Sequence, residues 1–227
     1  ELIAMVESAP LAFTPGTEVK QSATNFLLLT SIIEKVAKMP YHEFVKKNQI
    51  DYLGMKETYF GEDLSKVKQE NIGASRNLHQ AFKHDKDYID PLETPTGYRD
   101  KEGKLEKVAP LNGATMKGFS DLWASAEDVS HWDIALAGSI LIAKPENRAL
   151  IYEPTKLANG KTVPAMAGWQ FYHHKGLMDI KGNVPGYSAF LSRFTDPSEL
   201  VCVTLLANKE GVDLTNLARR IAAAFDN

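Results

Sequence analysis

The sequence lacks the features that mark several classes of protein. A single cysteine, Cys202, excludes an internal disulfide, and its place in the apolar run 200–206 predicts a buried, inert thiol. No stretch approaches the ~20 consecutive apolar residues of a membrane-spanning helix, and there is no low-complexity tract. The net charge of −3, from 26 basic and 29 acidic residues, offers no basic surface, so a nucleic-acid partner is not expected.

What the chain does have is enough length for a substantial core. Its 227 residues can form one large domain or two closely associated lobes. The chain opens on Glu1 and not on Met, so we expect that an upstream segment has been removed. The lack of a signal peptide therefore carries no information about the compartment.

Helical spacing dominates the first sixty residues or so. Apolar positions follow a helical period over residues 27–37, and Pro40 ends that helix because its ring and missing N–H cannot continue it. A shorter helix is expected over residues 41–50. The zone 61–120 is polar and rich in glycine and proline, which predicts a long, irregular surface excursion with turns such as that at residues 101–103.

The pattern changes in the second half of the chain. The Ser-Ala-Glu-Asp sequence at residues 125–128 resembles a capping box and predicts a further helix, and a last helix is expected with Asp213 as its N-cap. Between these helices, runs of β-prone residues separated by short turns predict an antiparallel meander, with strands at residues 169–174, 177–181, 187–194 and 200–207. Helices followed by such a meander indicate the α+β class.

This meander is small for a free-standing sheet. Three or four strands with one covering helix leave an edge exposed, and the chain therefore resembles the back portion of a larger fold. Because an exposed edge favours pairing with another copy, we expect that a homo-oligomer could form through it.

Seven short motifs occur in an order that resembles one known family. They are the Phe-Thr-Pro-Gly turn at 13–16, the apolar helix at 27–37, Leu-Gly-Met-Lys-Glu-Thr at 53–58, Gly118 followed by the capping box at 125–128, Gly-Trp at 168–169, Gly-Asn-Val-Pro-Gly at 182–186, and Leu-Leu-Ala-Asn at 205–208. Each motif is weak alone, but together they resemble the serine β-lactamase and penicillin-binding-protein superfamily, in its esterase and DD-peptidase branch.

The resemblance implies a β-lactamase/transpeptidase-like fold. We expect a single domain over residues 1–227, with a helical lobe at about 1–160 and the antiparallel sheet and last helix at about 161–227. The family's nucleophile lies in a Ser-x-x-Lys motif well upstream of this region, and no such motif occurs here in the right place. Residues 65–68 fit the spelling, but we interpret that match as chance.

The same resemblance assigns three side-chain roles to positions that cannot perform them. Gln21 occupies the position of the family's proton-transferring Tyr, and a carboxamide does not titrate. Ala23 stands where an Asn would orient the substrate amide, and Ile180 stands where a His or Lys is expected. Lys181 is adjacent to Ile180, but neighbouring strand residues point to opposite faces, so it is not expected to take over that role.

Two main-chain positions remain suited to the family's chemistry. The resemblance places Gly182 and the backbone N–H of Asn183 in the oxyanion hole, a role that uses main chain and tolerates side-chain changes. The alternative is that residues 182–186 are only a bend that leads into the next strand. No cofactor is expected, and no metal site either, since the adjacent His173 and His174 diverge on a strand and lack a third ligand.

Two functions stay open. In the first, the chain is the C-terminal part of a serine hydrolase that transfers the acyl group of an ester, a β-lactam or a D-alanyl peptide. In the second, it belongs to a catalytically silent relative that binds a small acyl molecule, a peptidoglycan-like ligand or a protein partner. Family analogy points to the cell envelope, in the periplasm or outside the cell.

Overall fold

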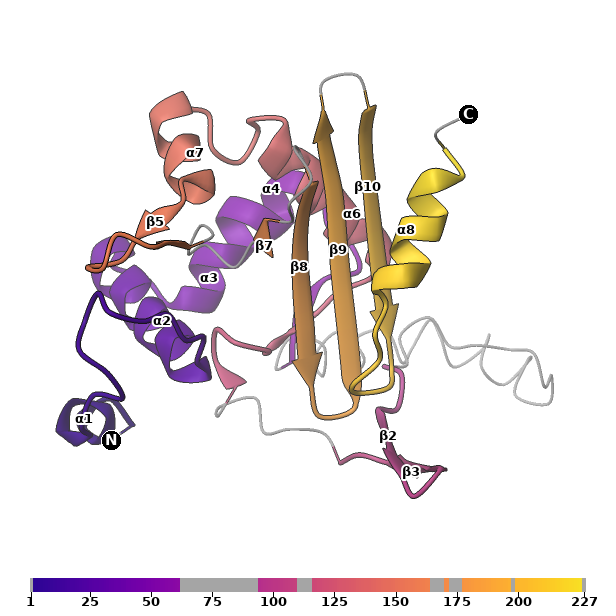
Figure 1. Ribbon diagram of the computed structural model, residues 1–227, viewed down its shortest axis with the longest axis horizontal. Coiled ribbons are helices and arrows are strands. Elements are labelled where there is room, and N and C mark those ends of the chain that lie inside the picture. Colours follow the sequence, from indigo (N-terminus) through magenta and orange to yellow (C-terminus); the bar gives the residue numbers. More distant parts are fainter. Residues whose placement is uncertain are drawn as a thin grey trace, which may run out of the picture.

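The computed structural model describes residues 2–61, 94–109, 116–163, 170–171, 177–196 and 199–225. Helices occupy the first part of the chain, and an antiparallel sheet followed by a helix occupies the last part, which confirms the α+β class (Figure 1). Among the described helices, none has the length and apolar composition that a membrane crossing requires.

The main sheet is four-stranded, in the order β10-β9-β8-β7. The long strands β8 (Leu177–Val184), β9 (Tyr187–Asp196) and β10 (Glu199–Ala207) pair in sequence, while β7 (Gln170–Phe171) is short. Every pair is antiparallel, as the sequence predicted. Each of the three long strands extends beyond its predicted range because the ladder continues through polar residues that a pattern of apolar positions does not mark.

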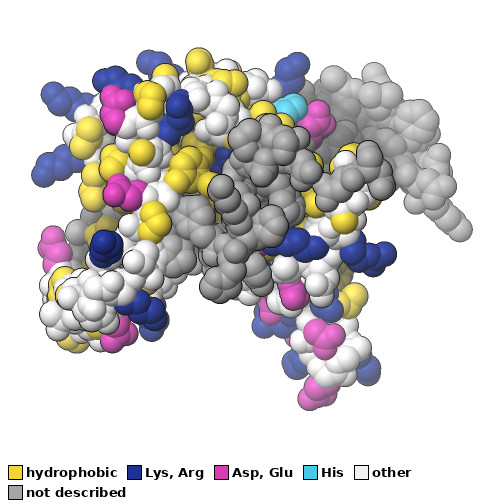
Figure 2. Space-filling view, turned by 45° about the horizontal axis from the view of Figure 1, so that its top comes forward, with side chains coloured by type: hydrophobic (Ala, Val, Ile, Leu, Met, Phe, Trp, Pro, Cys, Tyr) yellow, Lys and Arg dark blue, Asp and Glu magenta, His cyan; other side chains and the backbone are white. Residues whose placement is uncertain are grey.

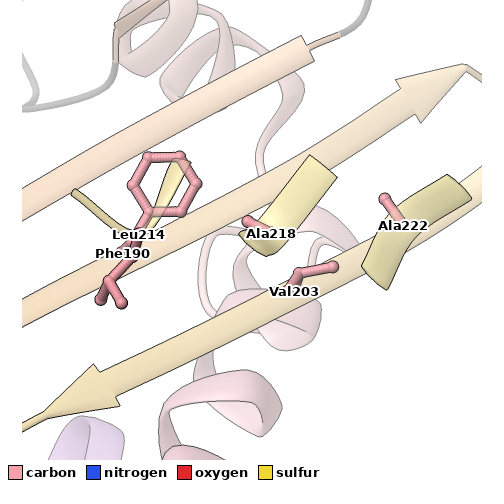
Figure 3. Close-up of a cluster of buried hydrophobic side chains, with 5 residues drawn as sticks. All are labelled: Phe190, Val203, Leu214, Ala218 and Ala222. Carbon is pink, nitrogen blue, oxygen red and sulfur yellow. The ribbon is translucent and has the colours of Figure 1, made fainter. Parts of the chain in front are cut away.

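The helix α8 (Thr215–Ala223) covers one face of this sheet. Phe190 and Val203 from the strands pack against apolar side chains from α8 and the loop before it, and the cluster consists of Phe190, Val203, Leu214, Ala218 and Ala222 (Figure 3). We call this side of the sheet the α8 face. The N-cap prediction was off by one position, because Leu214 occupies the cap; Asp213 nevertheless accepts a hydrogen bond from the backbone N–H of Thr215 at 3.0 Å.

The opposite side of the sheet, which we call the α6 face, packs on α6 (Ala126–Ala137). The hydroxyl oxygens of Ser130 on this helix and Thr204 on β10 lie 2.8 Å apart and share a hydrogen bond. Asp133, one helical turn further on, forms an ion pair with Arg193 of β9, with 3.6 Å between Oδ1 and Nε. The sheet is therefore covered by helices on both of its faces.

Two of the four predicted helix ends in the helical region are met; the first helix begins at Ala23 and not at residue 27, and the second ends at Leu53 and not at residue 50. The helix α2 (Ala23–Ala37) ends where predicted, and Pro40 lies at the N-cap of the next helix. That helix continues through three segments, α3 (Tyr41–Val45), the π-helical η1 (Lys46–Ile50) and α4 (Asp51–Leu53), and it closes at the left-handed Gly54. A short helix that the sequence pattern did not predict, α1 (Leu2–Ser8), precedes them.

Two of the family-like motifs hold each other in place. Asp128 of the capping box is buried, and its Oδ2 accepts hydrogen bonds from the Thr58 hydroxyl and from the Glu57 backbone N–H, both at 2.8 Å. The Ser125 hydroxyl caps α6 by accepting the N–H of Asp128 at 3.1 Å, which confirms the N-cap half of the predicted capping box. The reciprocal half does not form, because the Ser125 N–H donates to the Glu57 carbonyl at 3.3 Å. These motifs therefore join α6 to the segment after α4, and their role in this chain is structural.

Gly118 packs directly on α2. Its φ is +75°, and a Cβ added there would lie 2.3 Å from the Thr30 side chain, so only glycine fits. The neighbouring Lys117 donates to Glu34 of α2 at 2.7 Å, and this bond lowers the pKa of the Glu34 carboxyl below its ordinary value.

The described parts of the middle zone contain more regular structure than the prediction of an irregular excursion allowed. The strands β2 (Tyr98–Lys101) and β3 (Lys104–Lys107) form a charged hairpin that projects from the body (Figure 2). Its turn residues Glu102 and Gly103 both have positive φ, as a two-residue hairpin requires. Two further short antiparallel pairs are β1 (Tyr59–Phe60) with β4 (Leu122–Trp123), and β5 (Thr155–Lys156) with β6 (Thr162–Val163). The second pair directly follows the helix α7 (Pro145–Tyr152).

Candidate functional site

The first side of the candidate site is the chain that enters α2. Gln21 is exposed and lies just before the helix, and Ala23 is its first residue and is also exposed. Ser22, between them, is the N-cap, with an extended backbone and a hydroxyl that accepts the N–H of Thr24 at 3.3 Å. The Ser22 cap thus fixes where α2 begins. The side chains on either side of it are a carboxamide, at Gln21, which does not titrate, and a methyl group, at Ala23.

The second side is the strand β8. Lys181 lies on the α8 face, since its Nζ is 5.5 Å from the centroid of the Phe190 ring and 3.9 Å from an oxygen of Asp213. Because strand residues alternate, Ile180 and Gly182 turn toward the α6 face. Lys181 and Ile180 therefore face opposite sides of the sheet, as the alternation of strand residues predicted. Figure 1 shows α2 on the β7–β8 side of the sheet, away from β10.

Among the described residues, the backbone of β8 has one side without a paired strand next to the turn. Val184 and Tyr187 flank a two-residue turn, so the alternation of the ladder directs the N–H of Asn183 away from β9. In the described part of the chain, β7 pairs with β8 only at Met178 and Asp179, so residues 180–184 have no described strand on that side. The Asn183 N–H therefore points out of the ladder.

The side chain of Asn183 fixes this turn from the other direction. Its Oδ1 accepts the backbone N–H of Gly211 at 2.7 Å and lies 3.2 Å from the Ser188 hydroxyl oxygen. Ser188, in turn, accepts the N–H of Val212 at 3.1 Å and has its hydroxyl 2.8 Å from the Lys209 carbonyl. Asn183 is therefore tied to the chain after β10 through its side chain, while no described residue accepts a hydrogen bond from its main-chain N–H.

A second set of contacts supports the same hairpin. Gly186 has a φ of +86°, and its N–H donates to the Glu210 carboxylate at 2.7 Å. Gly97 packs against it so closely that a Cβ on Gly97 would lie 2.9 Å from the Gly186 Cα. The Tyr98 N–H completes the junction by donating to the carbonyl oxygens of Gly186 and Asn208. The sequence analysis missed Gly97 and Glu210; the Pro-Thr-Gly turn at residues 95–97 was the available signal for the former.

The chemistry that these positions can supply is limited to hydrogen bonding, from main-chain groups and from the Gln21 carboxamide. None of Gln21, Ala23 and Ile180 titrates, so the three positions contribute no acid, base or nucleophile. Within the described ranges, no group of three or more His, Cys, Asp or Glu side chains is placed to hold a metal ion. The Ser-x-x-Lys match at 65–68, Trp169 and the pair His173 and His174 lie outside the described residues.

Helices cover both faces of the sheet. With this architecture, the chain has the fold of the penicillin-binding-protein and β-lactamase-like serine hydrolases. A family model described as Beta-lactamase matches residues 1–225. The chain therefore belongs to the β-lactamase family. In sequence it is similar to penicillin-binding protein 4* of Bacillus subtilis (strain 168), with 27% identity over 206 residues that cover 87% of this chain and 41% of the relative.

Solved structures agree on the fold. The penicillin-binding protein from Bacillus halodurans has a TM-score of 0.64 at 18% identity, over 96% of this chain and 60% of that one. An octameric penicillin-binding protein homologue from Pyrococcus abyssi has a TM-score of 0.65 at 23% identity, over 94% and 44%. A D-stereospecific amidohydrolase from a Streptomyces species has a TM-score of 0.66 at 18% identity, over 99% and 59%. The chain thus spans about two fifths to three fifths of the lengths of these proteins.

Proposed function

We propose that this chain is the C-terminal part of a serine hydrolase that performs acyl transfer, and that it contributes the oxyanion side of the active site. The observation that carries the proposal is the Asn183 N–H, which points to the open side of β8 beside Gly182. Donors of this kind stabilise the negative oxygen that develops when an acyl carbon is attacked, and a main-chain N–H held by a tight turn needs no reorganisation.

The nucleophile and its base come, in this proposal, from chain outside these 227 residues. Gln21, Ala23 and Ile180 have no titrating group, so the chain alone is expected to be inert in hydrolysis. The relatives include a penicillin-binding protein and a D-stereospecific amidohydrolase, which supports an ester, a β-lactam or a D-alanyl peptide as the substrate class. The same analogy supports a place in the cell envelope.

A silent binding protein is the second candidate, and the three vacated positions favour it. A carboxamide, a methyl group and a branched alkyl group stand together where the family's chemistry needs groups that move protons or orient the substrate. Such a protein would keep the oxyanion donors and bind small acyl or peptidoglycan-like ligands without turning them over.

A covalent label on the complete gene product separates the two. A fluorophosphonate or a fluorescent penicillin is expected to form an adduct with the enzyme and none with the silent binder. Asn183→Pro then tests the oxyanion role, because it removes an N–H that the ladder does not use, while Asn183→Ala keeps it. We expect Asn183→Pro to slow labelling by about 10²–10³ relative to Asn183→Ala. Equal rates in the two variants would overturn the oxyanion assignment, and no adduct with the unmodified protein would remove the enzyme.

We further propose that copies of the protein associate through β10. In the described part of the chain, β10 pairs with β9 only, and one outer edge is left. The octameric state of the Pyrococcus abyssi homologue supports self-association. Light scattering on residues 1–227 alone tests the proposal, because the edge is predicted to be open when the rest of the larger fold is absent; a monomer at all accessible concentrations would contradict it.

A further inference from the structure

The segment that carries Gln21 has few hydrogen bonds to the other described residues. Residues 10–20 are exposed, apart from a half-buried Phe13. The cap of α2 holds the C-terminal end of the segment. In the described part of the chain, one hydrogen bond joins residues 10–21 to another segment, from the Ala158 N–H to the Gly16 carbonyl at 2.8 Å. The partner of this bond therefore bears directly on where Gln21 lies.

Ala158 belongs to a segment that consists of a helix followed by a β-hairpin. It lies in the turn between β5 and β6, which is closed by hydrogen bonds from the Gly160 N–H to the Leu157 carbonyl and from the Leu157 N–H to the Lys161 carbonyl, both at 2.9 Å. The hairpin directly follows α7, and Figure 1 shows it reaching from α7 toward the chain between α1 and α2. We call residues 145–163, which contain α7, β5 and β6, the strap.

The other end of the strap is attached to the sheet. Tyr152, the last residue of α7, accepts a hydrogen bond from Nη2 of Arg193 at 3.2 Å. The Arg193 Cζ also lies 5.7 Å from the centroid of the Tyr152 ring. Arg193 is 1% exposed and is paired with Asp133, so the guanidinium that receives the tyrosine is itself fixed.

We propose that the strap sets the position of the Gln21 segment relative to β8, and that Tyr152 is the positioning residue. The strap links Arg193, on the strand next to β8, to Gly16, five residues before Gln21. Its significance for activity rests on the proposed function, because Gln21 and Asn183 are the two sides of the proposed site. Its geometry can be tested independently of that function.

Two substitutions cut the strap at its two ends. Ala158→Pro removes the N–H that Gly16 accepts, yet proline suits this second position of the Leu157–Gly160 turn, and Ala158→Ser is the matched control that keeps the N–H. Tyr152→Phe removes the hydroxyl and keeps the ring. Its control is Tyr59→Phe, which removes a hydroxyl whose partner among the described residues is the nearby Lys56 carbonyl.

The readout is a distance between spin labels in the complete gene product. Labels at Glu18→Cys and Arg220→Cys, both exposed positions, report the Gln21 segment against α8 in a Cys202→Ala background. We expect Ala158→Pro and Tyr152→Phe each to shift the mean distance by about 3 Å or more, the rise of one strand residue, or to broaden the distribution. The two controls are expected to match the parent.

If the label distances in Ala158→Pro and in Tyr152→Phe both matched the parent, the proposal that the strap positions the Gln21 segment would be wrong, even if the melting temperatures of these variants fall. A change in Ala158→Pro alone would overturn the role of Tyr152. The rate of covalent labelling is measured on the same variants, and we expect it to fall where the distance changes. If the parent forms no adduct, the proposed function fails, while the distances still decide the strap.

Discussion

The two faces of the sheet each hold a buried aspartate with an arginine partner, but the two pairs differ in their access to water. On the α6 face, Asp133 and Arg193 have side chains only 2% and 1% exposed. On the α8 face, the Asp179 side chain is 1% exposed, while Arg219, which reaches it from α8, is 27% exposed. The register pairs Asp179 with Ser192, the neighbour of Arg193, so the two pairs lie back to back at one level of the sheet.

The difference separates two ways of attaching a helix to a sheet. Arg219 keeps part of its hydration and donates to both Asp179 and the Ser192 hydroxyl. It therefore attaches α8 to the sheet at a modest desolvation cost. Arg193 is almost fully removed from water, and its partners include Asp133 of α6 and Tyr152 of α7. A fully buried pair gains little over apolar packing but is costly to break, and it therefore fixes the arrangement of the elements that supply it.

The largest effect is expected on the α6 face. Arg193→Met leaves Asp133 buried without its cation, and we expect a loss of about 3–5 kcal/mol in the free energy of unfolding, measured by urea titration. The double variant Asp133→Leu, Arg193→Met is expected to recover most of this loss, because an apolar pair replaces the charges. If the single variant lost less than about 1 kcal/mol, the Asp133–Arg193 pair would contribute no more than a solvent-exposed ion pair does, and the prediction would be wrong.

The matching change on the α8 face should cost less. Arg219→Met removes a partly hydrated cation, and water can reach Asp179 in its place, so we expect a loss of about 1–3 kcal/mol. Arg220→Met, at the exposed neighbouring position on α8, is the control and is expected to be nearly neutral. If the Arg219 variant lost more stability than the Arg193 variant, the contrast between the faces would be reversed.

The α6 face should also show a pH signature. Burial raises the pKa of Asp133 above its ordinary value of 3.8, and the Arg193 charge partly offsets this rise. A carboxyl with a raised pKa binds its proton more tightly in the folded state, so its contribution to stability falls as the pH rises through the folded pKa. Without Arg193 the pKa of Asp133 is higher still. The deficit of Arg193→Met is therefore expected to be small in acid and to grow toward neutral pH.

Unfolding experiments across this pH range check the signature, with Asp133→Asn, Arg193→Met as the control that has no carboxyl to titrate. A deficit that is constant with pH in the single variant would show that Asp133 does not change its protonation there.

The smallest effect concerns Cys202, which is paired with Arg193 in the ladder. Burial, together with the nearby Asp133, raises the pKa of this thiol from 9.0 to about 12. That rise lowers the thiolate fraction at neutral pH about a thousandfold. We expect iodoacetamide to label Cys202 quickly in urea and very slowly in the folded protein. If iodoacetamide labelled Cys202 equally fast in urea and in the folded protein, the thiol would not be shielded on the α6 face and the prediction would be wrong.

Local patterns predicted much of the fold. The apolar spacing of residues 27–37 and the capping box at 125–128 gave α2 and α6, because helix periodicity and capping involve residues at most four apart. The three long strands were recognised from their β-prone composition. The short helices α1 and α7 were missed, since seven or eight residues carry too little periodic signal.

The candidate site was predictable only in part. Register within the motifs placed Gln21, Ala23 and Ile180 at their positions, and their roles remain predictions. The contacts that hold the site were not predictable, because they join residues far apart in the chain. Examples are the packing of Gly97 on Gly186 and the bond between Asn183 and Gly211.

By itself, the sequence determined the class of the fold, the limits of its longer helices and strands, and the absence of a titrating group at Gln21, Ala23 and Ile180. These properties depend on residue type and short-range spacing. The tertiary structure alone decided that the Asn183 N–H points out of the ladder, which arginine neutralises which buried aspartate, and that Tyr152 meets Arg193. Such pairings arise when distant segments are packed together to exclude water from the sheet, and local periodicity does not encode them.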